Sequence, residues 1–344
     1  MAAAKMKYDL KLTERVRKFA LELGSSLFGV ADAGILNEAL EEGFRPEDSL
    51  PGCKAVVVLS LHIPDGALEI LRRGKSNYSY NLFGYAYLNR ELDFLIYRIT
   101  CFLEEEGYAA VPLPARGTMY GASKPYFGPL SYRHCAVAAG LAAFGMNGLA
   151  LTPRYGSRQR FVGIPTTAPL KPAEKFLDQS AVCDGCMECI RNCPAHALTL
   201  NPPHICKLGG QIYRYANVDP KACTHMSRGL STKVWTGAPF NPKIDVPVTE
   251  NQDKAGHYDD LWNKRDAGIR ISEHAEATYG ATLCGRCMAF CTAGHDAMNR
   301  RMRPCQTAFQ DDRVFYPDGS LKVPERIAAL RRRQKRPAGH KKNR

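Results

Sequence analysis

The sequence predicts an α/β protein built from layers of helices and strands, followed by a cysteine-rich segment. Two observations carry this prediction: helical and strand-like hydrophobic patterns alternate over residues 1–178, and two dense cysteine motifs follow them. The length of 344 residues and the hydrophobic content of 45% suit one large domain or two ordinary domains with a real core. No run approaches the roughly 18 consecutive apolar residues of a membrane-spanning helix, so we expect a soluble protein.

An amphipathic helix is predicted first, over residues 12–24. Its apolar side chains recur at helical spacing, at Leu12, Val16, Phe19 and Leu23, and Gly24 is suited to end it. The short apolar runs at 26–33 and 53–63 are rich in β-branched residues and bounded by Gly and Pro, which predicts buried strands. The N-terminus is charged where an export signal needs an apolar stretch, so we expect a cytoplasmic protein.

The longest helical pattern covers residues 87–107 and ends at Gly107, before an apparent strand at 109–114. An alanine-rich helix is predicted after Pro129, and it breaks into a glycine-punctuated loop before a strand at 161–164. This loop is not a dinucleotide fingerprint, because G-x-G-x-x-G is absent, and the chain has no Walker A, H-E-x-x-H or G-x-S-x-G motif.

The most specific motif is CDGCMECIRNCP, which contains Cys183, Cys186, Cys189 and Cys193. It is the C-x2-C-x2-C-x3-C-P run of two-cluster ferredoxins. The two-residue gaps wrap the chain around three corners of one [4Fe–4S] cluster, and the fourth cysteine ligates the other cluster. One such motif therefore predicts a second. Disulfides are a poor explanation for 13 cysteines in a reducing compartment.

CGRCMAFC supplies the second motif, in C-x2-C-x3-C spacing, with Thr292 where a proline is usual. One thiolate must come from elsewhere, and Cys223 is the candidate, with Cys206 as the fallback. The ferredoxin crossing rule predicts Cys183, Cys186, Cys189 and Cys291 around one cluster and Cys193, Cys223, Cys284 and Cys287 around the other. Two zinc sites are the alternative, but zinc favours paired C-x2-C knuckles at long separation. The remaining cysteines are expected to pack as small apolar residues: Cys53, Cys101, Cys135, Cys206 and Cys305.

Positive charge is concentrated at the C-terminal end. The formal net charge is +13, of which residues 325–344 supply +8, so the rest of the chain is only moderately basic. We expect a solvated, flexible terminus, with an anion or RNA contact as the alternative. A further segment, 232–276, is rich in polar and aromatic residues; it is either a substrate-facing insertion or a surface elaboration.

Residues 139–170, AGLAAFGMNGLALTPRYGSRQRFVGIPTTAPL, followed by CDGCMECIRNCP, resemble the superfamily of reductive dehalogenases and epoxyqueuosine reductases. The resemblance covers the predicted strands, the long helix and both cysteine motifs, and leaves out the tail. It implies a nitroreductase-like core that binds cobalamin in the base-off form. Two [4Fe–4S] clusters in a ferredoxin-like domain would supply this core with electrons.

By position in this block, the residues that the resemblance places near the corrin are Gly140, Gly145, Asn147, Gly148, Tyr155, Gly156 and Arg158. Counting back from the AGL helix puts Tyr126 where epoxyqueuosine reductases carry an Asp, and reductive dehalogenases use a tyrosine as the acid. Tyr126 is therefore the candidate proton donor, with Lys124 or Arg160 as a cation that helps its phenol to share the proton. The alternative is that Tyr126 only packs a turn beside Pro125.

These expectations form one hypothesis, a cytoplasmic cobalamin- and [4Fe–4S]-dependent reductase that removes a halide or similar leaving group from a small organic substrate. Its electron donor would be a ferredoxin or flavodoxin, since no flavin or nicotinamide motif is visible. One alternative is an epoxyqueuosine reductase acting on tRNA, favoured by the basic tail and opposed by the missing Asp. The other is a non-catalytic electron-transfer or corrinoid-handling protein.

The predicted domains follow from this hypothesis. Residues 1–178 form the corrinoid-binding core and residues 179–312 the iron–sulfur domain, with the insertion near 232–276. Residues 313–344 form the basic tail.

Overall fold

The computed structural model describes residues 7–73, 78–116, 127–227, 284–294, 314–315 and 321–322. The chain divides into two compact units, residues 1–299 and 300–344. In the second unit, the described residues form one antiparallel pair, β8 (Val314–Phe315) and β9 (Leu321–Lys322). All other elements belong to the first unit.

A three-stranded antiparallel sheet lies at the centre of the first unit, in the order β1 (Leu27–Asp32), β2 (Ala55–His62) and β5 (Gln159–Thr166). The central strand is the run of β-branched and apolar residues that the sequence predicts as buried, and Val56–Leu59 are fully buried. β5 begins two residues before the predicted strand at 161–164 and pairs with β2 from Gln159 to Thr166. β5 has β2 as its neighbour on one side and is an edge strand of this sheet.

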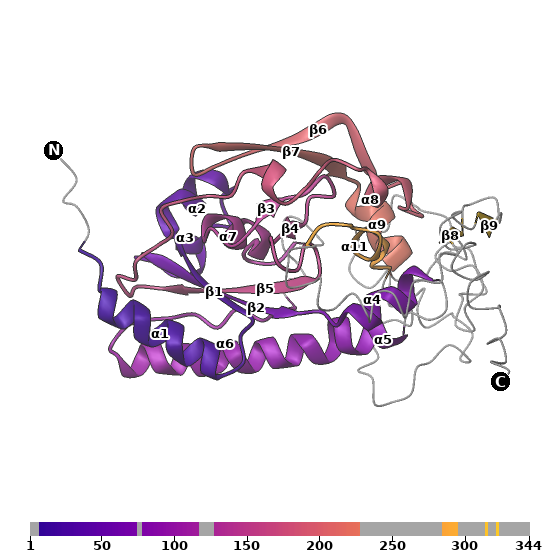
Figure 1. Ribbon diagram of the computed structural model, residues 1–344. Coiled ribbons are helices and arrows are strands. Elements are labelled where there is room, and N and C mark those ends of the chain that lie inside the picture. Colours follow the sequence, from indigo (N-terminus) through magenta and orange to yellow (C-terminus); the bar gives the residue numbers. More distant parts are fainter. Residues whose placement is uncertain are drawn as a thin grey trace, which may run out of the picture. The chain divides into compact units, whose positions relative to one another are not determined.

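Helices cover both faces of this sheet (Figure 1). α1 (Leu10–Glu22) and the long α6 (Tyr87–Glu105) pack against one face, and α2 (Ala33–Ala39) and α7 (Tyr132–Ala138) pack against the other. The predicted helices are confirmed with small shifts at their ends. Gly24 follows α1 with φ of 99°, a conformation that glycine adopts without steric cost.

The prediction of a strand at 109–114 is wrong. These residues form only an isolated bridge between Ala110 and Thr166. Pro112 and Pro114 have no backbone N–H to donate to a ladder, which explains why the apolar run does not continue as a strand.

Several shorter elements complete the first unit. α3 (Pro46–Ser49) precedes β2, and α4 (Asp65–Arg72) and α5 (Tyr78–Asn81) lead through the π-helical turn η1 (Leu82–Ala86) into α6. Two short strands, β3 (Ala143–Phe144) and β4 (Ala150–Leu151), form the loop between α7 and β5. In the described residues, no helix has both the length and the apolar character of a membrane span.

The cysteine-bearing segments lie around a long hairpin. The 3-10 turn η2 (Gln179–Ala181) and α8 (Glu188–Arg191) precede the hairpin of β6 (Leu198–Leu208) and β7 (Gln211–Val218), and α9 (Pro220–Ser227) follows it. α11 (Arg286–Ala289) packs against α8 and α4. The two cysteine motifs are thereby brought together although they are about ninety residues apart in sequence.

Candidate functional site

The two cysteine motifs have the same local backbone. In each, a residue with positive φ follows a cysteine and begins a four-residue helix: Met187 (φ 62°) precedes α8 and Gly285 (φ 58°) precedes α11. In each, the N–H of the last cysteine donates to the carbonyl oxygen three residues earlier at 3.1 Å. The spacing C-x2-C-x3-C therefore corresponds to one local backbone conformation that occurs twice in the chain. It occurs at Cys186, Cys189 and Cys193, and again at Cys284, Cys287 and Cys291.

Three thiols lie near that of Cys189, which is buried. Together, burial and the charges of the neighbouring thiols of Cys291, Cys183 and Cys186 raise the pKa of Cys189 to about 12, with burial the largest cause. These are the four residues of the first predicted ligand set, and we call them the first thiol group.

The other four thiols gather around Cys284 and Cys287. The pKa of Cys284 is raised to about 12. Burial is the largest cause of this rise, and the charges of Cys223 and Cys193 contribute to it. Burial also raises the pKa of Cys287, helped by Cys284, Cys223, Cys193 and, from the first group, Cys189. The second predicted ligand set is thus also brought together, next to the first, and we call it the second thiol group.

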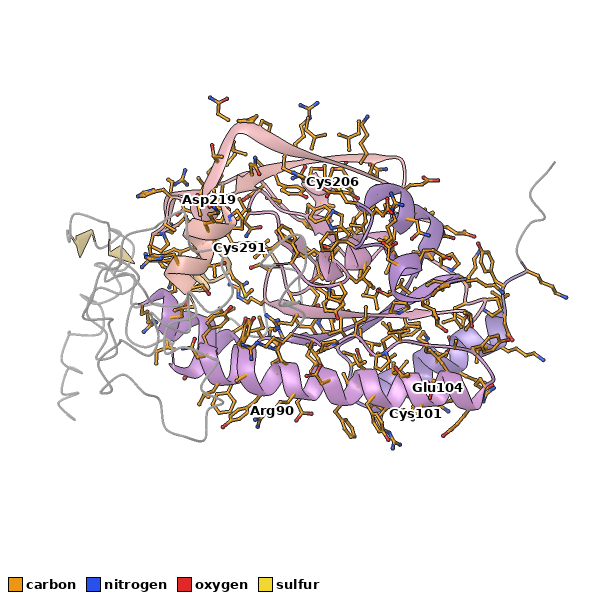
Figure 2. All side chains as sticks on the ribbon, turned by 180° about the vertical axis from the view of Figure 1, so that it is seen from behind. Arg90, Cys101, Glu104, Cys206, Asp219 and Cys291 are labelled. Atoms are coloured by element: carbon orange, nitrogen blue, oxygen red, sulfur yellow. The ribbon has the colours of Figure 1, made fainter. Side chains whose placement is uncertain are left out.

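Cys223 enters this group through the start of α9. The Asp219 carboxylate accepts hydrogen bonds from the backbone N–H groups of Lys221 (2.9 Å) and Ala222 (3.0 Å) and fixes the first turn, which carries Cys223. Figure 2 shows Asp219 where hairpin β6–β7 ends and Cys206 on the hairpin itself. Burial raises the pKa of Cys206 to about 11, and the charge that acts on it is that of Arg133. The structure therefore places Cys223, and not Cys206, among the second group.

The spacing of the thiols bears on the kind of metal centre. Among the described residues, no three His, Cys, Asp or Glu side chains converge closely enough to hold a single metal ion. A Zn–thiolate bond of about 2.3 Å would bring the ligand sulfurs within about 4 Å of one another. A [4Fe–4S] cluster instead separates its thiolates by a cube of iron and sulfide. The prediction of two clusters rather than two zinc ions rests on the spacing of the cysteines in the sequence.

The second cysteine motif is held by side chains from the segment that leads into β5. The amide of Asn147 donates to the carbonyl oxygen of Cys287 at 3.3 Å, and the Ser157 hydroxyl donates to that of Met288 at 3.2 Å. Both side chains are buried, so these hydrogen bonds are shielded from water.

Arg158 makes the most extensive of these contacts. Its guanidinium donates to the carbonyl oxygens of Ala293 at 3.2 Å and Cys291 at 3.4 Å, and it forms an ion pair with Asp65 at 3.2 Å. The side chains of this pair are only 14% and 18% exposed. Arg158, predicted near the corrin, thus joins α4 and the second cysteine motif.

Close backbone packing explains the glycines predicted near the corrin. Gly156 has φ of 57°, and a Cβ there would lie 2.2 Å from the carbonyl oxygen of Ala293, so only glycine fits. A Cβ at Gly140, Gly145 or Gly148 would likewise meet protein atoms, those of Lys175, Leu151 and Tyr215 respectively. Tyr155 stacks on the ring of His62, with the centroids 4.6 Å apart.

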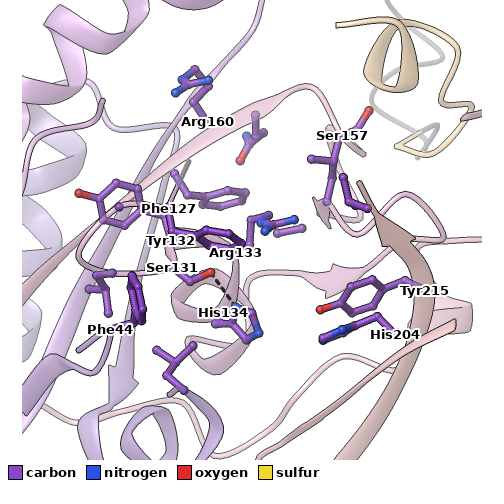
Figure 3. A pocket seen from close by; sticks show the side chains of 18 of the residues that line it. Phe44, Phe127, Ser131, Tyr132, Arg133, His134, Ser157, Arg160, His204 and Tyr215 are labelled. Atoms are coloured by element: carbon purple, nitrogen blue, oxygen red, sulfur yellow. Dashed lines mark hydrogen bonds between the residues drawn. The ribbon is translucent and has the colours of Figure 1, made fainter. Parts of the chain in front are cut away.

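A cavity of about 580 Å³ opens beside these contacts (Figure 3), within the size range of small-molecule sites. Its polar lining includes Ser131, Arg133, His134, Ser157, Gln159, Arg160, His204 and Tyr215, and its apolar lining includes Phe44, Phe127, Phe161 and Met288. None of the seven residues predicted near the corrin lines it, whereas Arg160 does. Those seven residues surround the second cysteine motif or pack within the core.

Two side chains present polar atoms that have no partner. Both amide atoms of Gln159 and the Nε of Arg160 are buried and make no hydrogen bond to any residue that the structure describes. The Arg160 guanidinium lies over the ring of Tyr85, 4.2 Å from its centroid. Since an unsatisfied buried polar atom costs about 1–3 kcal/mol, this cavity is suited to a ligand that carries hydrogen-bonding groups.

Ser131 and His134 form a hydrogen-bonded pair at the wall of the cavity, with Oγ and Nδ1 2.7 Å apart (Figure 3). Burial, with smaller contributions from the charges of Arg133 and His204, lowers the pKa of His134 to about 3. The imidazole is therefore neutral near pH 7 and can accept or donate one hydrogen bond at each nitrogen.

Tyr132 is also fixed in place. Its hydroxyl lies 3.0 Å from the carbonyl oxygen of Leu113 and 2.8 Å from that of Pro114, and burial raises its pKa. This phenol is a structural hydrogen-bond donor. The predicted proton donor Tyr126 and its partner Lys124 lie outside the described residues, as do segment 232–276 and the tail from 323 onward.

The sequence contains no signal for most of the cavity lining. Gln159 opens β5, His134 lies on α7, and His204 and Tyr215 stack on each other across the hairpin with their ring centroids 4.8 Å apart. These residues share no motif or spacing. Only the fold brings them to one cavity.

Comparison with known proteins relates the chain to one group of enzymes. A tetrachloroethene reductive dehalogenase of Desulfitobacterium hafniense (strain Y51) is 31% identical over 259 residues, 69% of this chain and 42% of that protein. One of Dehalobacter restrictus is 31% identical over 158 residues, 46% of this chain and 24% of that protein. The chain is a relative of the reductive dehalogenases. This confirms the superfamily predicted from the sequence. No protein-family model matches the chain.

Solved reductive dehalogenase structures share the fold. One, from which a mechanism for B12-dependent dehalogenation was suggested, aligns with a TM-score of 0.53 at 15% identity and covers 96% of this chain and 37% of that chain. A catabolic reductive dehalogenase aligns with a TM-score of 0.51 at 16% identity, over 95% of this chain and 36% of that one. An epoxyqueuosine reductase aligns with a TM-score of 0.44 at 17% identity, over 83% of this chain and 66% of that one. The chain spans less than half the length of the curated dehalogenases it matches.

Proposed function

We propose that the chain is a cobalamin- and [4Fe–4S]-dependent reductase that removes a halide from a small organic substrate. The observation that carries this proposal is that two groups of four thiols meet beside a cavity with unpartnered polar atoms. The cavity lies next to the second cysteine motif in the chain, because Met288, which lines the cavity, follows the ligand candidate Cys287. The relationship to reductive dehalogenases supports the same activity.

The thiol groups supply the ligands for two clusters, one in each group. Cys183, Cys186, Cys189 and Cys291 would hold the first, and Cys193, Cys223, Cys284 and Cys287 the second. Cys189 of the first group is among the thiols whose charge raises the pKa of Cys287 of the second, after burial and the thiols of its own group, which supports electron transfer between neighbouring clusters. This arrangement supports an iron–sulfur domain that includes residues 179–227 and 284–294.

The cavity has the polar chemistry that a corrinoid needs. A corrin ring carries amide side chains around its edge, and these match the unpartnered amide of Gln159 and the Nε of Arg160. When bound, the corrinoid supplies a low-potential cobalt that can cleave a carbon–halogen bond reductively. The chain's part is to position the ring against Gln159 and Arg160, to exclude water with Phe44, Phe127 and Phe161, and to deliver a proton.

The proton donor is proposed to be Tyr126, ten residues upstream of Ala136 in α7. The nearby described groups limit the alternatives. Tyr132 is committed to the carbonyl oxygens of Leu113 and Pro114, and His134 is neutral near pH 7 and hydrogen-bonded to Ser131. Ferredoxin or flavodoxin would supply the electrons from outside the chain.

The curated relatives support this reductase over the two alternatives, an epoxyqueuosine reductase and an electron carrier. The test is an anaerobic assay on the full chain, reconstituted with iron and sulfide, with and without cobalamin and with a strong chemical reductant. Chlorinated and brominated phenols and alkenes serve as substrates, and released halide is measured.

We expect cobalamin-dependent halide release above that of free cobalamin, and its loss when Cys287 is replaced by Ser. Release no faster than with free cobalamin, from protein that holds both clusters and the corrinoid, would contradict the proposal.

A further inference from the structure

The second cysteine motif carries a guanidinium that has no acidic partner among the described residues. Arg286, between the ligand candidates Cys284 and Cys287, is half-buried and lies over the ring of Phe290, 5.2 Å from its centroid. Its Nε donates to the carbonyl oxygen of Asn192 at 3.2 Å. Within the described part of the chain, no carboxylate forms an ion pair with it.

Arg286 lies close to the second thiol group. It stands between Cys284 and Cys287 in the chain, and its Nε hydrogen bond ends on the carbonyl oxygen of Asn192, the residue before Cys193. These three cysteines belong to the second thiol group. A half-buried cation is stabilised by a nearby anion or by hydrogen bonds, and the cluster proposed for this group would supply the negative charge.

The cations at the first thiol group are compensated. Arg158, which donates to the carbonyl oxygen of Cys291, is ion-paired with Asp65 at 3.2 Å. Arg191, which donates to the carbonyl oxygen of Cys186, is ion-paired with Glu188. Each of these guanidinium charges is therefore partly cancelled where it faces the first group.

Two further charges of opposite sign act on Cys223 in the second group. Burial raises the pKa of Cys223 to about 11 in total, with Cys193 and Asp219 adding to the rise and Arg133 opposing it. Arg133 donates to the carbonyl oxygen of Gly148 at 2.7 Å and stays at the wall of the cavity. Arg286 is thus the charge that distinguishes the surroundings of the second group from those of the first.

We propose that Arg286 is the counter-ion of the cluster held by the second thiol group, and that it makes this cluster easier to reduce than the first. This inference rests on the proposed function, because it requires both clusters. One-electron reduction adds a negative charge to the cluster, and a nearby uncompensated cation stabilises the reduced form more than an ion pair does. The second group adjoins the cavity through Met288, so electrons would pass downhill from the first cluster to the one nearer the cavity.

The test is a potentiometric titration followed by electron paramagnetic resonance, on the full chain reconstituted anaerobically with iron and sulfide and without cobalamin. Two midpoint potentials are expected. In Arg286→Gln the higher midpoint potential should fall by about 59 mV, which corresponds to a tenfold change in the equilibrium constant of a one-electron reduction. In Arg286→Lys, which keeps the charge, it should fall by much less.

Asp65→Asn is the matched variant at the first group, because it leaves the charge of Arg158 uncompensated. It should raise the lower midpoint and leave the higher one in place, so the inference stays testable if Arg286→Gln retains too little iron. The inference would be overturned if Arg286→Gln with full iron kept both midpoints, if Gln and Lys had equal effects, or if Asp65→Asn did not raise the lower midpoint. Wild-type protein that takes up no more than trace iron would instead refute the proposed function.

Discussion

Arg158 donates a hydrogen bond to the carbonyl oxygen of Ala293, 3.2 Å away and 135 residues later in the chain. The same guanidinium is ion-paired with Asp65 and reaches the carbonyl oxygen of Cys291. One side chain therefore fixes the end of the second cysteine motif against the helical core. The arrangement of the thiol groups depends on this docking, since Cys291 belongs to the first group and its two motif partners belong to the second.

Replacing Arg158 with Ala should release the second cysteine motif from the core. The substitution removes two hydrogen bonds and leaves Asp65 half-buried without its partner, which should cost about 2–4 kcal/mol. We expect the iron content after reconstitution to fall by about half or more, since the cluster that needs Cys291 loses a positioned ligand. Arg17→Ala, which removes only an exposed ion pair with Glu14, is the control and should change the free energy of unfolding by less than about 0.5 kcal/mol. Full iron content in Arg158→Ala would show that the docking is not required.

Gly156→Ala should be much more destabilising than alanine at an open glycine. The new Cβ would lie 2.2 Å from the carbonyl oxygen of Ala293, so the two backbones must separate. Together with the positive φ, this should cost about 3 kcal/mol. Gly52 also has positive φ but no atom within 4 Å of a built Cβ, so Gly52→Ala should cost only about 1 kcal/mol. Equal urea midpoints for the two variants would contradict the close contact.

Gln159→Leu should stabilise the free protein and weaken corrinoid binding. It removes two buried amide atoms that have no partner, so we expect the free energy of unfolding to rise by about 1 kcal/mol. The same change removes a hydrogen-bonding partner of the ligand, so Kd for cobalamin, measured by absorbance titration, should rise about tenfold, equivalent to about 1.4 kcal/mol. A loss of stability with an unchanged Kd would mean that the amide serves the fold and not the ligand.

His134 should make the protein less stable in mild acid. Its pKa is lowered from 6.5 to about 3 on folding, so between these values the unfolded chain binds more protons than the folded one. The stability that the neutral, buried His134 contributes is fully present above pH 6.5 and is lost as the pH falls below it. The free energy of unfolding then decreases by up to about 1.4 kcal/mol per pH unit.

Urea denaturation at pH 7 and pH 5 measures this effect. His134→Gln should lose less stability than the wild type between the two pH values. Part of the acid sensitivity should remain, because burial also lowers the pKa of His62. An identical pH dependence in variant and wild type would contradict the burial of His134.

The parts of the fold that were predictable are those with local patterns. α1 follows from helical spacing and its closing glycine, and β2 follows from an unbroken β-branched run. The strand predicted at 109–114 did not form, because its apolar residues are typical of a strand but its prolines cannot donate the backbone hydrogen bonds of a sheet. The assignment of each cysteine to one cluster stays a prediction from the spacing, because the gaps within each motif limit which thiols can reach one cluster.

The cavity was not predictable, since its polar residues come from α7, β5 and the hairpin. The glycine-rich block predicted near the corrin is placed differently from the cavity. In the structure Asn147, Gly156 and Arg158 contact the second cysteine motif or the residues that follow it, and they do not line the cavity. A sequence pattern records that a segment is constrained, and does not reveal what constrains it.

The proposed function depends on eight thiols that hold two [4Fe–4S] clusters. The iron and acid-labile sulfide content of anaerobically reconstituted wild type, Cys223→Ser and Cys206→Ser, read beside their electron paramagnetic resonance spectra, measures this directly. We expect about eight irons per chain in the wild type and in Cys206→Ser, and a loss of about half of them in Cys223→Ser. Wild-type protein that retains zinc in place of iron, or an iron loss in Cys206→Ser with none in Cys223→Ser, would contradict this expectation.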